Sequence, residues 1–256
     1  MIASHPDISP NCEKVAAHLQ GGASKLRVLD LFSGIGGFSL GLERTGGFET
    51  VAFCEIDPFC RRVLAKHWPD VRQFEDVTKL RGEDVGPVDV ICGGFPCQDI
   101  SWAGQGAGLH GERSGLWHEF ARLIGEIRPS FVIVENSAAL LHRGMGDVLS
   151  SLAAIGYDAE WHCISASDLG APHSRERLWL VAYPEGQRPG QLRWLGRAAE
   201  SEGIRDIHWP EHEPPNERVV IGLPDQVERV TALGNALLPQ IPELIGRSIL
   251  EARAAA

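Results

Sequence analysis

The sequence of 256 residues lacks any apolar run that approaches the roughly 20 residues a helix needs to cross a bilayer. Its first residues, 1–22, also lack the basic and then apolar layout of a secretory signal. Internal repeats and low-complexity tracts are missing as well. We therefore expect a cytoplasmic protein with no membrane partner, of a length that suits one sizeable domain or a domain with a small appendage.

Paired cysteines are missing too. The chain has six cysteines, and none of them stands in a C-x-x-C spacing with another. This pattern argues against a disulfide framework and against a zinc site. We expect most of these thiols to be reduced and buried, and we expect no bound metal.

A basic excess is also absent, since the formal net charge is -10. Phosphate contacts need Lys or Arg, so any surface for nucleic acid must be a local basic patch. One stretch qualifies, because its arginines outnumber its acids Glu176, Glu185 and Glu200. Its arginines are Arg175, Arg177, Arg188, Arg193 and Arg197. For the last three, an ordinary solvated face of mixed charge is the better interpretation.

What the sequence does contain is a regular alternation of apolar runs and helical patterns. Strands are predicted at 27–32, 50–55, 88–92 and 131–135, and helices at 58–67, 116–127, 146–154 and 240–253. Two further strands, 157–165 and 178–183, predict a hairpin that extends the same sheet. The alternation predicts an α/β fold, a mostly parallel twisted sheet with helices on both faces.

The informative loops all follow predicted strands. They begin at Ser33, Glu55, Gly93 and Glu135. Ligands of such sheets bind beyond the carboxyl ends of the strands, so we expect the functional site at this edge. The loop between the two hairpin strands is predicted to add His173, Arg175 and Arg177.

The first of these loops lies in the segment DLFSGIGG, residues 30–37. Its glycines let the backbone approach a ligand closely, but their spacing does not fit the dinucleotide fingerprint G-x-G-x-x-G. Glu55 and Asp57 end the next strand, where a carboxylate could grip ribose hydroxyls. A nucleoside-bearing cofactor without a pyrophosphate suits this pattern better. Asp76 could accept from an adenine amine, although such a residue taken alone is more often a cap or turn residue.

The segment GGFPCQDIS, residues 93–101, places Cys97 after a strand. A lone cysteine is usually an inert core residue. A Gly/Pro-shaped turn at the functional edge of a sheet instead favours a thiolate that attacks an electrophile. Glu135, Arg175 and Arg177 add a carboxyl group and two guanidiniums at the same edge, and a structural ion-pair network remains an alternative for these three.

Together, these segments resemble one family, the cytosine carbon-5 DNA methyltransferases. The resemblance covers residues 27–183 and resumes at 232–249. Five motifs follow the family's order: DLFSGIGG resembles its S-adenosylmethionine loop, GFPCQ its catalytic loop, ENS its ENV segment, RER the second half of its QxRxR segment, and LGNALLPQ its closing GN segment. The resemblance implies a Rossmann-like S-adenosylmethionine-dependent enzyme that makes 5-methylcytosine in double-stranded DNA.

The resemblance also implies roles for single residues. Cys97 would add to carbon-6 of a flipped-out cytosine, since neither ring face is reachable inside a duplex. Glu135 would hold the ring nitrogen and exocyclic amine, and Arg177 the carbonyl oxygen. Arg175 would assist the catalytic set, touch DNA or brace its loop. DNA contacts are further expected from Gln98, Ser101 and Arg113.

For the cofactor, the family pattern implies contacts from the glycine loop, from the ends of the next strands and from the closing segment. The expected residues are Phe32, Ser33, Gly34, Ile35, Gly36, Glu55, Ile56, Asp76, Val77, Pro96 and Asn235. Pro96 would also shape the catalytic loop. Glu55 would bind the ribose hydroxyls, Asp76 the adenine amine, and Asn235 would close over the methionine end.

The chain departs from the family pattern in two places. His173 stands where the QxRxR segment begins with Gln, and Ser137 replaces the Val of ENV. The region available for target recognition is also short. We expect a catalytic domain at 24–183, a recognition insertion at 184–229 and a returning segment at 230–256, with short or relaxed specificity or specificity supplied by a partner.

Two alternatives to a DNA methyltransferase stay open at this point. The tRNA-methylating branch of the family shares the catalytic set, so substrate choice is undecided. A non-catalytic regulator would have lost some of Cys97, Glu135, Arg177 or the glycine loop, and none is missing. We expect a monomer, with or without a cognate restriction enzyme, and the short insertion would suit a phage or prophage enzyme.

Overall fold

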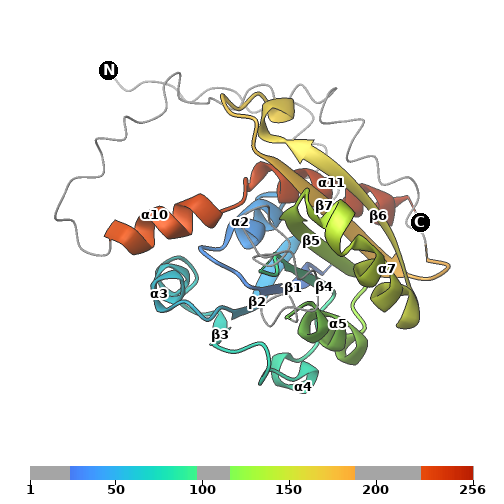
Figure 1. The fold of residues 1–256 in the computed structure, drawn as a ribbon. Coiled ribbons are helices and arrows are strands. Elements are labelled where there is room, and N and C mark those ends of the chain that lie inside the picture. The colour runs from blue at the N-terminus through green and yellow to red at the C-terminus, as the bar shows by residue number, and fades with distance from the viewer. Residues whose placement is uncertain (1–23, 97–115, 188–225, 256) are drawn as a thin grey trace, which may run out of the picture.

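The computed structural model describes residues 24–96, 116–187 and 226–255. Its centre is one seven-stranded sheet in the order β3-β2-β1-β4-β5-β7-β6 (Figure 1). The strands are β1 (Leu26–Leu31), β2 (Phe48–Cys54), β3 (Arg72–Phe74), β4 (Val90–Gly93), β5 (Phe131–Ser137), β6 (Tyr157–Ser165) and β7 (Glu176–Pro184). Strands β1 to β5 pair in parallel, whereas β7 pairs antiparallel with both β5 and β6. The predicted mostly parallel sheet and its hairpin extension are confirmed.

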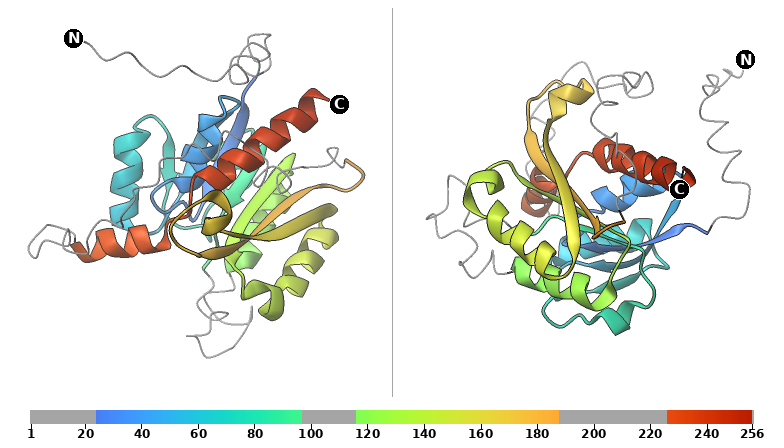
Figure 2. Two further views of the ribbon diagram at one scale, coloured as in Figure 1. Left: turned by 90° about the horizontal axis from the view of Figure 1, so that it is seen from above. Right: turned by 90° about the vertical axis from the view of Figure 1, so that its right-hand side faces the viewer.

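Helices cover both faces of this sheet, as predicted. Within the described ranges they are α2 (Gly37–Arg44), α3 (Pro58–His67), α4 (Gly82–Val85), α5 (Leu116–Ile127), α6 (Leu140–Arg143), α7 (Met145–Ala154), α10 (Gln226–Asn235) and α11 (Gln240–Ala254), with the 3₁₀ turn η2 (Ala166–Leu169). Side chains of α5 and α7 belong to one buried cluster, and those of α2 and α11 to another. The two views of Figure 2 show α11 lying against α2, and the β6–β7 hairpin extending beyond the parallel strands with η2 at its tip.

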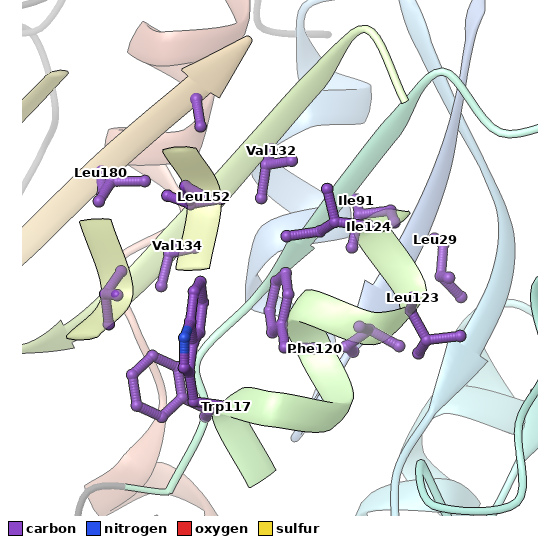
Figure 3. Close-up of a cluster of buried hydrophobic side chains, with 14 of the residues drawn as sticks. Leu29, Ile91, Trp117, Phe120, Leu123, Ile124, Val132, Val134, Leu152 and Leu180 are labelled. Atoms are coloured by element: carbon purple, nitrogen blue, oxygen red, sulfur yellow. The ribbon is translucent and has the colours of Figure 1, made fainter. Parts of the chain in front are cut away.

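The first cluster fixes α5 against the sheet. Apolar residues recur along α5 at helical spacing, with Trp117, Phe120 and Ile124 all fully buried. Figure 3 shows these side chains facing strand residues such as Ile91 and Val134. The rings of Trp117 and Phe120 stack with their centroids 5.6 Å apart. This packing holds α5 against the sheet from its first turn onward.

The second cluster brings α2 and α11 together. Phe38 of α2 meets Trp179 of β7 edge to face, with ring centroids 5.6 Å apart. A Cβ atom added to Gly41 would lie 2.1 Å from the backbone oxygen of Pro239, so only glycine permits this approach of the two helices. The start of α11 is therefore held close to the helix that follows the glycine loop.

Helix α3 begins and ends where the sequence predicts. Asp57 is extended at its N-cap, and its Oδ1 accepts from the backbone N–H of Cys60 at 2.9 Å. Pro58 occupies the first turn, where its missing N–H costs nothing. The cap ends strand β2 abruptly and leaves Glu55 and Ile56 in the short connection at the sheet edge.

The structure corrects two expectations at the hairpin. The loop expected to begin at Glu135 is strand, because β5 continues to Ser137. Arg177, expected in the loop between the hairpin strands, lies inside β7 instead. Both changes have one cause, which is that Ser137 pairs with Arg177 and so extends the antiparallel ladder to the edge of the sheet.

Helix α10 is not among the helices that the sequence predicted. Its residues are largely polar and show no strong helical period. The expected recognition insertion, which ends at residue 229, therefore includes the start of this helix. Most of the expected recognition insertion, including Arg188, Arg193 and Arg197, lies outside the described residues. Within the described residues, no helix has the length and apolar character required to span a membrane.

Candidate active site

Most of the residues singled out by sequence that the structure describes lie at one edge of the sheet. Strands β1, β2, β3, β4 and β5 run in parallel and end there, and antiparallel β7 begins there. The loop after β1, the connection after β2, the start of the Cys97 loop after β4, and the Glu135 and Arg177 positions are therefore neighbours. This is the edge at which open α/β sheets bind ligands.

The glycine loop after β1 has an unusual backbone. Phe32 adopts a φ of 52°, and Gly34 and Gly36 have φ values of 53° and 86°. A non-glycine residue in this left-handed region marks strain that the surroundings must hold. Ser33 supplies part of that support, since its Oγ donates to the backbone oxygen of Asp30 at 2.6 Å. A Cβ at Gly34 would meet no atom within 4 Å, so the loop borders open space there.

Glu55 ties the glycine loop to the end of β2. Its Oε2 accepts from the backbone N–H of Gly34 at 2.7 Å, and its Oε1 accepts from that of Asp57 at 2.8 Å. Beside it, the apolar side chain of Ile56 is 74% exposed. A carboxylate and an exposed apolar surface side by side suit a ligand with both sugar hydroxyls and a flat ring.

Asp76 is held in a turn of its own. Its Oδ1 accepts from the backbone N–H of Thr78 at 3.0 Å and from the hydroxyl at 2.7 Å, and these bonds lower the pKa of the carboxyl. Lys79 Nζ lies 3.4 Å from its Oδ2. The geometry is that of a turn residue, the alternative left open by the sequence. Val77 has its side chain buried in the core, which leaves only its backbone for a ligand.

A surface cavity of about 280 Å³ also reaches Asp76. It is lined by Phe74, Glu75, Asp76, Lys79, Leu80 and Asp84. Of the expected site residues it includes Asp76 alone, and it contains neither Glu55 nor Glu135. The cavity therefore lies to one side of the convergence of strand ends and does not by itself define the site.

A buried acid, Asp30, lies under the glycine loop. Its Oδ2 accepts from the hydroxyl of Ser39 in α2 at 2.8 Å, so Asp30 spans the loop through its side chain and its backbone. Burial raises the pKa of Asp30 to about 8, although the Ser39 bonds oppose the shift. Oδ1 has no hydrogen-bond partner within the described part of the chain. Sequence reasoning missed this role, although a charged residue inside an apolar strand was the available signal.

The loop after β4 passes directly over Glu135. A Cβ added to Gly94 would lie 3.0 Å from Oε2 of Glu135, tighter than ordinary contact. The next residue, Phe95, is buried against Trp117. Asn136 Nδ2 donates to the backbone oxygen of Phe95 at 3.2 Å. Asn136 thus braces the loop up to Pro96, a role that the family motif did not reveal.

Glu135 and Arg177 form an ion pair at the centre of this edge. Arg177 Nε lies 3.0 Å from Glu135 Oε1, and the side chains are only 31% and 14% exposed for arginine and glutamate respectively. Burial raises the pKa of the Glu135 carboxyl, and the charges of Arg177 and Arg175 partly offset that shift. Such a carboxyl can bind a hydrogen-bond donor or hold a proton closer to neutral pH than an exposed glutamate can.

Arg175 links the hairpin to the end of α10. Its Nη1 donates to the backbone oxygen of Gly234 at 2.6 Å. Burial lowers the pKa of its guanidinium, and the neighbouring Arg177 adds to this effect. Asn235, the next residue after Gly234, ends α10 with an exposed side chain. The departure from the family pattern, His173, accepts at Nδ1 from the backbone N–H of Arg175 at 3.4 Å.

Four expected site residues lie outside the described residues. They are Cys97, Gln98, Ser101 and Arg113. The structure brings together Glu135, Arg177 and the loop up to Pro96, and it brings Glu55 to the glycine loop. The described part of the site thus consists of a carboxylate and guanidinium pair beside a loop that leads to a cysteine, next to a glycine turn with its own carboxylate.

Comparison with known proteins identifies similar chains. A model of C-5 cytosine-specific DNA methylases matches residues 26–249. The type II methyltransferase M2.BsuMI of Bacillus subtilis (strain 168) is 36% identical over 165 residues, covering 61% of this chain and 42% of that protein. The orphan methyltransferase M.SPRI of Bacillus phage SPR is 33% identical over 168 residues, covering 63% of this chain and 38% of that protein.

A solved structure agrees with the family model and with these two relatives. The crystal structure of a protein assigned as a DNA modification methyltransferase, encoded within a prophage of E. coli, superposes with a TM-score of 0.54 at 31% identity. The match covers 62% of this chain and 47% of that one. The chain thus shares its fold with the E. coli protein. It spans less than half the length of each of these three relatives.

Proposed function

Since this chain belongs to the C-5 cytosine-specific DNA methylase family, we propose that it transfers a methyl group from S-adenosylmethionine to carbon-5 of cytosine in DNA. The observation that carries the proposal is the Glu135–Arg177 ion pair, which lies beside the loop that leads to Cys97. A buried carboxyl with a raised pKa and an adjacent guanidinium suit the polar edge of a pyrimidine ring. The relatives named as methyltransferases support the same reaction.

The residues of the glycine loop fit the cofactor. Gly34 faces open space, Glu55 lies within hydrogen-bond distance of the loop, and Ile56 offers an exposed apolar surface. Glu55 would exchange its bond to Gly34 for ribose hydroxyls, and Ile56 would pack on the adenine. Further contacts would come from Phe32, Ser33, Ile35, Gly36, Asp76, Val77, Pro96 and Asn235. When bound, S-adenosylmethionine supplies the methyl group as an electrophile.

Chemistry at the base would begin with the thiolate of Cys97. Cytosine carbon-5 is a poor nucleophile, so the thiolate first forms a bond to carbon-6 and pushes electron density to carbon-5. Glu135 holds the ring nitrogen and exocyclic amine by hydrogen bonding or proton transfer, and Arg177 holds the carbonyl oxygen. After carbon-5 takes the methyl group, its proton leaves and the carbon–sulfur bond breaks, which frees Cys97.

Access to the base and its sequence context would come from other residues. The target nucleotide must leave the duplex to reach Cys97. Gln98, Ser101 and Arg113 would contact the DNA backbone or fill the space of the flipped base. Residues 184–229 would form the recognition insertion between the catalytic domain at 24–183 and the returning segment at 230–256. A short or relaxed recognition site follows from so short an insertion.

The experiment that tests this proposal measures labelled methyl transfer from S-adenosylmethionine to duplex DNA and, in parallel, to tRNA. We expect transfer to DNA, with 5-methylcytosine as the product in the hydrolysed DNA. Activity confined to tRNA would contradict the DNA assignment while leaving the cytosine chemistry intact. Methylome sequencing of cells that express the chain would then report the modified context.

A further inference from the structure

Arg175 lies between the part of the proposed site that contains Glu135 and the part proposed to bind the cofactor. On one side, its charge acts on the Glu135 carboxyl, and it neighbours Arg177. On the other side, its Nη1 donates to the backbone oxygen of Gly234, which is 59 positions away in the sequence. The hydrogen bond is 2.6 Å long, which is short for a bond that a charged N–H group donates. One side chain thus joins the hairpin to the closing segment, which we define as residues 234–238.

The bond to Gly234 also suits the end of a helix. The last carbonyl oxygens of α10 have no intrahelical partner, and the C-terminal end of a helix carries partial negative charge. A guanidinium that donates to such an oxygen satisfies the orphan acceptor and opposes that charge. Arg175 therefore contacts the chain where α10 ends and the turn toward α11 begins.

The closing segment rests in turn on the glycine loop. A Cβ atom added to Gly37, the first residue of α2, would lie 2.9 Å from Cγ of Leu237. Pro239 approaches Gly41 of the same helix more closely still, since a Cβ atom at Gly41 would lie 2.1 Å from its backbone oxygen. Because Gly37 directly follows the loop that holds Gly34 and Gly36, a shift of the closing segment reaches the proposed cofactor site. Asn235 lies between the two anchors, Gly234 and Leu237.

We propose that Arg175 is a positioning residue that holds the closing segment against the glycine loop and thereby helps to shape the cofactor site. The inference rests on the proposed function for the identity of the cofactor. It separates Arg175 from Arg177, whose bonds go to Glu135 and to the backbone oxygen of Glu176. A direct DNA contact by Arg175 is the alternative, and it predicts no effect on the cofactor in the absence of DNA.

The test measures S-adenosylhomocysteine binding by calorimetry without DNA. Arg175→Met keeps an unbranched apolar stem and removes the donors, so Kd should rise about tenfold, the effect of losing one hydrogen bond from a charged group. Arg175→Lys can still donate to the Gly234 oxygen and should restore part of the affinity. Arg177→Met should leave Kd within about twofold of the wild type. Arg247→Met serves as the matched control, because Arg247 pairs with Glu243 on α11.

Turnover on DNA gives a second, independent readout. Arg175→Met should raise KM for S-adenosylmethionine more than it lowers kcat, whereas Arg177→Met should lower kcat and leave that KM unchanged. Thermal unfolding identifies variants that fail to fold. If Arg175→Met is one of them, Arg175→Leu, which also has no hydrogen-bond donor, carries the same comparison.

The outcomes separate this inference from the proposed function. A folded Arg175→Met protein with the wild-type Kd for S-adenosylhomocysteine would overturn the positioning role. A wild-type protein that binds S-adenosylhomocysteine but methylates no DNA would overturn the proposed reaction, and the Kd comparison would still decide the role of Arg175. A wild-type protein that binds no S-adenosylhomocysteine would overturn both.

Discussion

Glu135 and Arg177 pair diagonally across antiparallel strands β5 and β7, with 3.0 Å between Glu135 Oε1 and Arg177 Nε. The second carboxylate oxygen, Oε2, points toward the backbone of Gly94 in the loop that leads to Cys97. One glutamate therefore has a guanidinium on one oxygen and the proposed nucleophile loop beside the other. The carboxyl group therefore lies against the start of the segment that continues to Cys97.

Glu135→Gln tests the role of this carboxyl. The amide is similar in size but is neutral and cannot transfer a proton as the acid does, so we expect kcat to fall by about 100-fold or more. The affinity for S-adenosylhomocysteine should change little, because Glu135 contacts the Cys97 loop rather than the glycine loop. Steady-state kinetics on duplex DNA measure the first effect, and calorimetry the second.

Glu176→Gln is the matched control, since Glu176 is exposed on the same strand as Arg177. It should keep the wild-type kcat. A Glu135→Gln enzyme with undiminished turnover would remove Glu135 from the mechanism.

Much of this architecture follows from sequence, and the exceptions have physical causes. Apolar periodicity located α3, α5 and α11 to within about two residues, because each buries one clear face and, in α3, a cap and a proline mark the start. The ends of β5 and β7 were misplaced, since polar Asn136 and Ser137 join a strand only through tertiary pairing.

The candidate site, like the fold, could be predicted from the sequence only in part. Motif order pointed to Glu135 and Arg177, which the structure brings into contact. The supporting contacts were not accessible from sequence: Asp30 to Ser39, Asn136 to Phe95, and Arg175 to Gly234. Each of these contacts joins residues that the fold brings together. Because every residue has a backbone oxygen, the sequence does not indicate that Gly234 is the one that accepts from Arg175.

Gly94→Ala should reduce turnover more than stability. The new Cβ would lie 3.0 Å from Glu135 Oε2 and 3.3 Å from its backbone oxygen, so either the loop or the carboxyl must move. A misplacement of about 1 Å at a reacting group can cost roughly 100-fold in rate. Kinetics on duplex DNA, combined with thermal unfolding, measure the two effects separately.

Gly146→Ala is the control for this substitution. Its Cβ would meet nothing within 4 Å, and Gly146 lies in the first turn of helix α7, so the stability of the protein should change by less than about 1 kcal/mol, with unchanged turnover. Equal activity in the Gly94→Ala and Gly146→Ala proteins would show that the Gly94 contact does not constrain Glu135.

Asp30 should make the stability of the fold depend on pH. Burial raises its pKa from 3.8 to about 8, so its charged form is disfavoured in the folded state. Asp30 therefore makes its full contribution to stability below pH 3.8, and this contribution is lost as the pH rises through about 8. The free energy of unfolding falls by about 1.4 kcal/mol for each unit of difference between the two pKa values. Chemical denaturation at about pH 5 and about pH 9 covers most of this range.

Asp30→Asn should weaken that dependence, because the amide stays neutral and its oxygen can still accept from Ser39. Relative to the wild type, the variant should therefore be more stable at the higher pH than at the lower. Asp158→Asn, at an exposed position on β6, should keep the wild-type difference. Identical pH dependence in the Asp30→Asn and wild-type proteins would mean that Asp30 is not buried as a neutral acid.

The described thiols should resist alkylation in the folded protein. Burial and the charge of Glu55 raise the pKa of Cys54 and of Cys60 to about 12, and burial likewise raises the pKa of Cys92 and of Cys163. Since the thiolate is the reactive form, iodoacetamide near neutral pH should leave these four unmodified. The loss of activity should be proportional to alkylation of the Cys97 peptide, which peptide mapping by mass spectrometry quantifies.

Unfolding in denaturant should expose all four thiols to the reagent, which provides the control. Alkylation of Cys54 or Cys92 in the native protein at the rate of the unfolded chain would contradict the burial on which this expectation depends.

The covalent role of Cys97 is tested most directly with duplex DNA that contains 5-fluorocytosine, incubated with S-adenosylmethionine and analysed by mass spectrometry under denaturing conditions. Fluorine at carbon-5 cannot leave as the proton does, so the wild-type protein should remain bonded to the methylated base through Cys97. Cys97→Ala should form no adduct and should transfer no methyl group, while still binding S-adenosylhomocysteine. A Cys97→Ala protein that methylates DNA at the normal rate, or an active wild-type protein that leaves no adduct, would contradict the account.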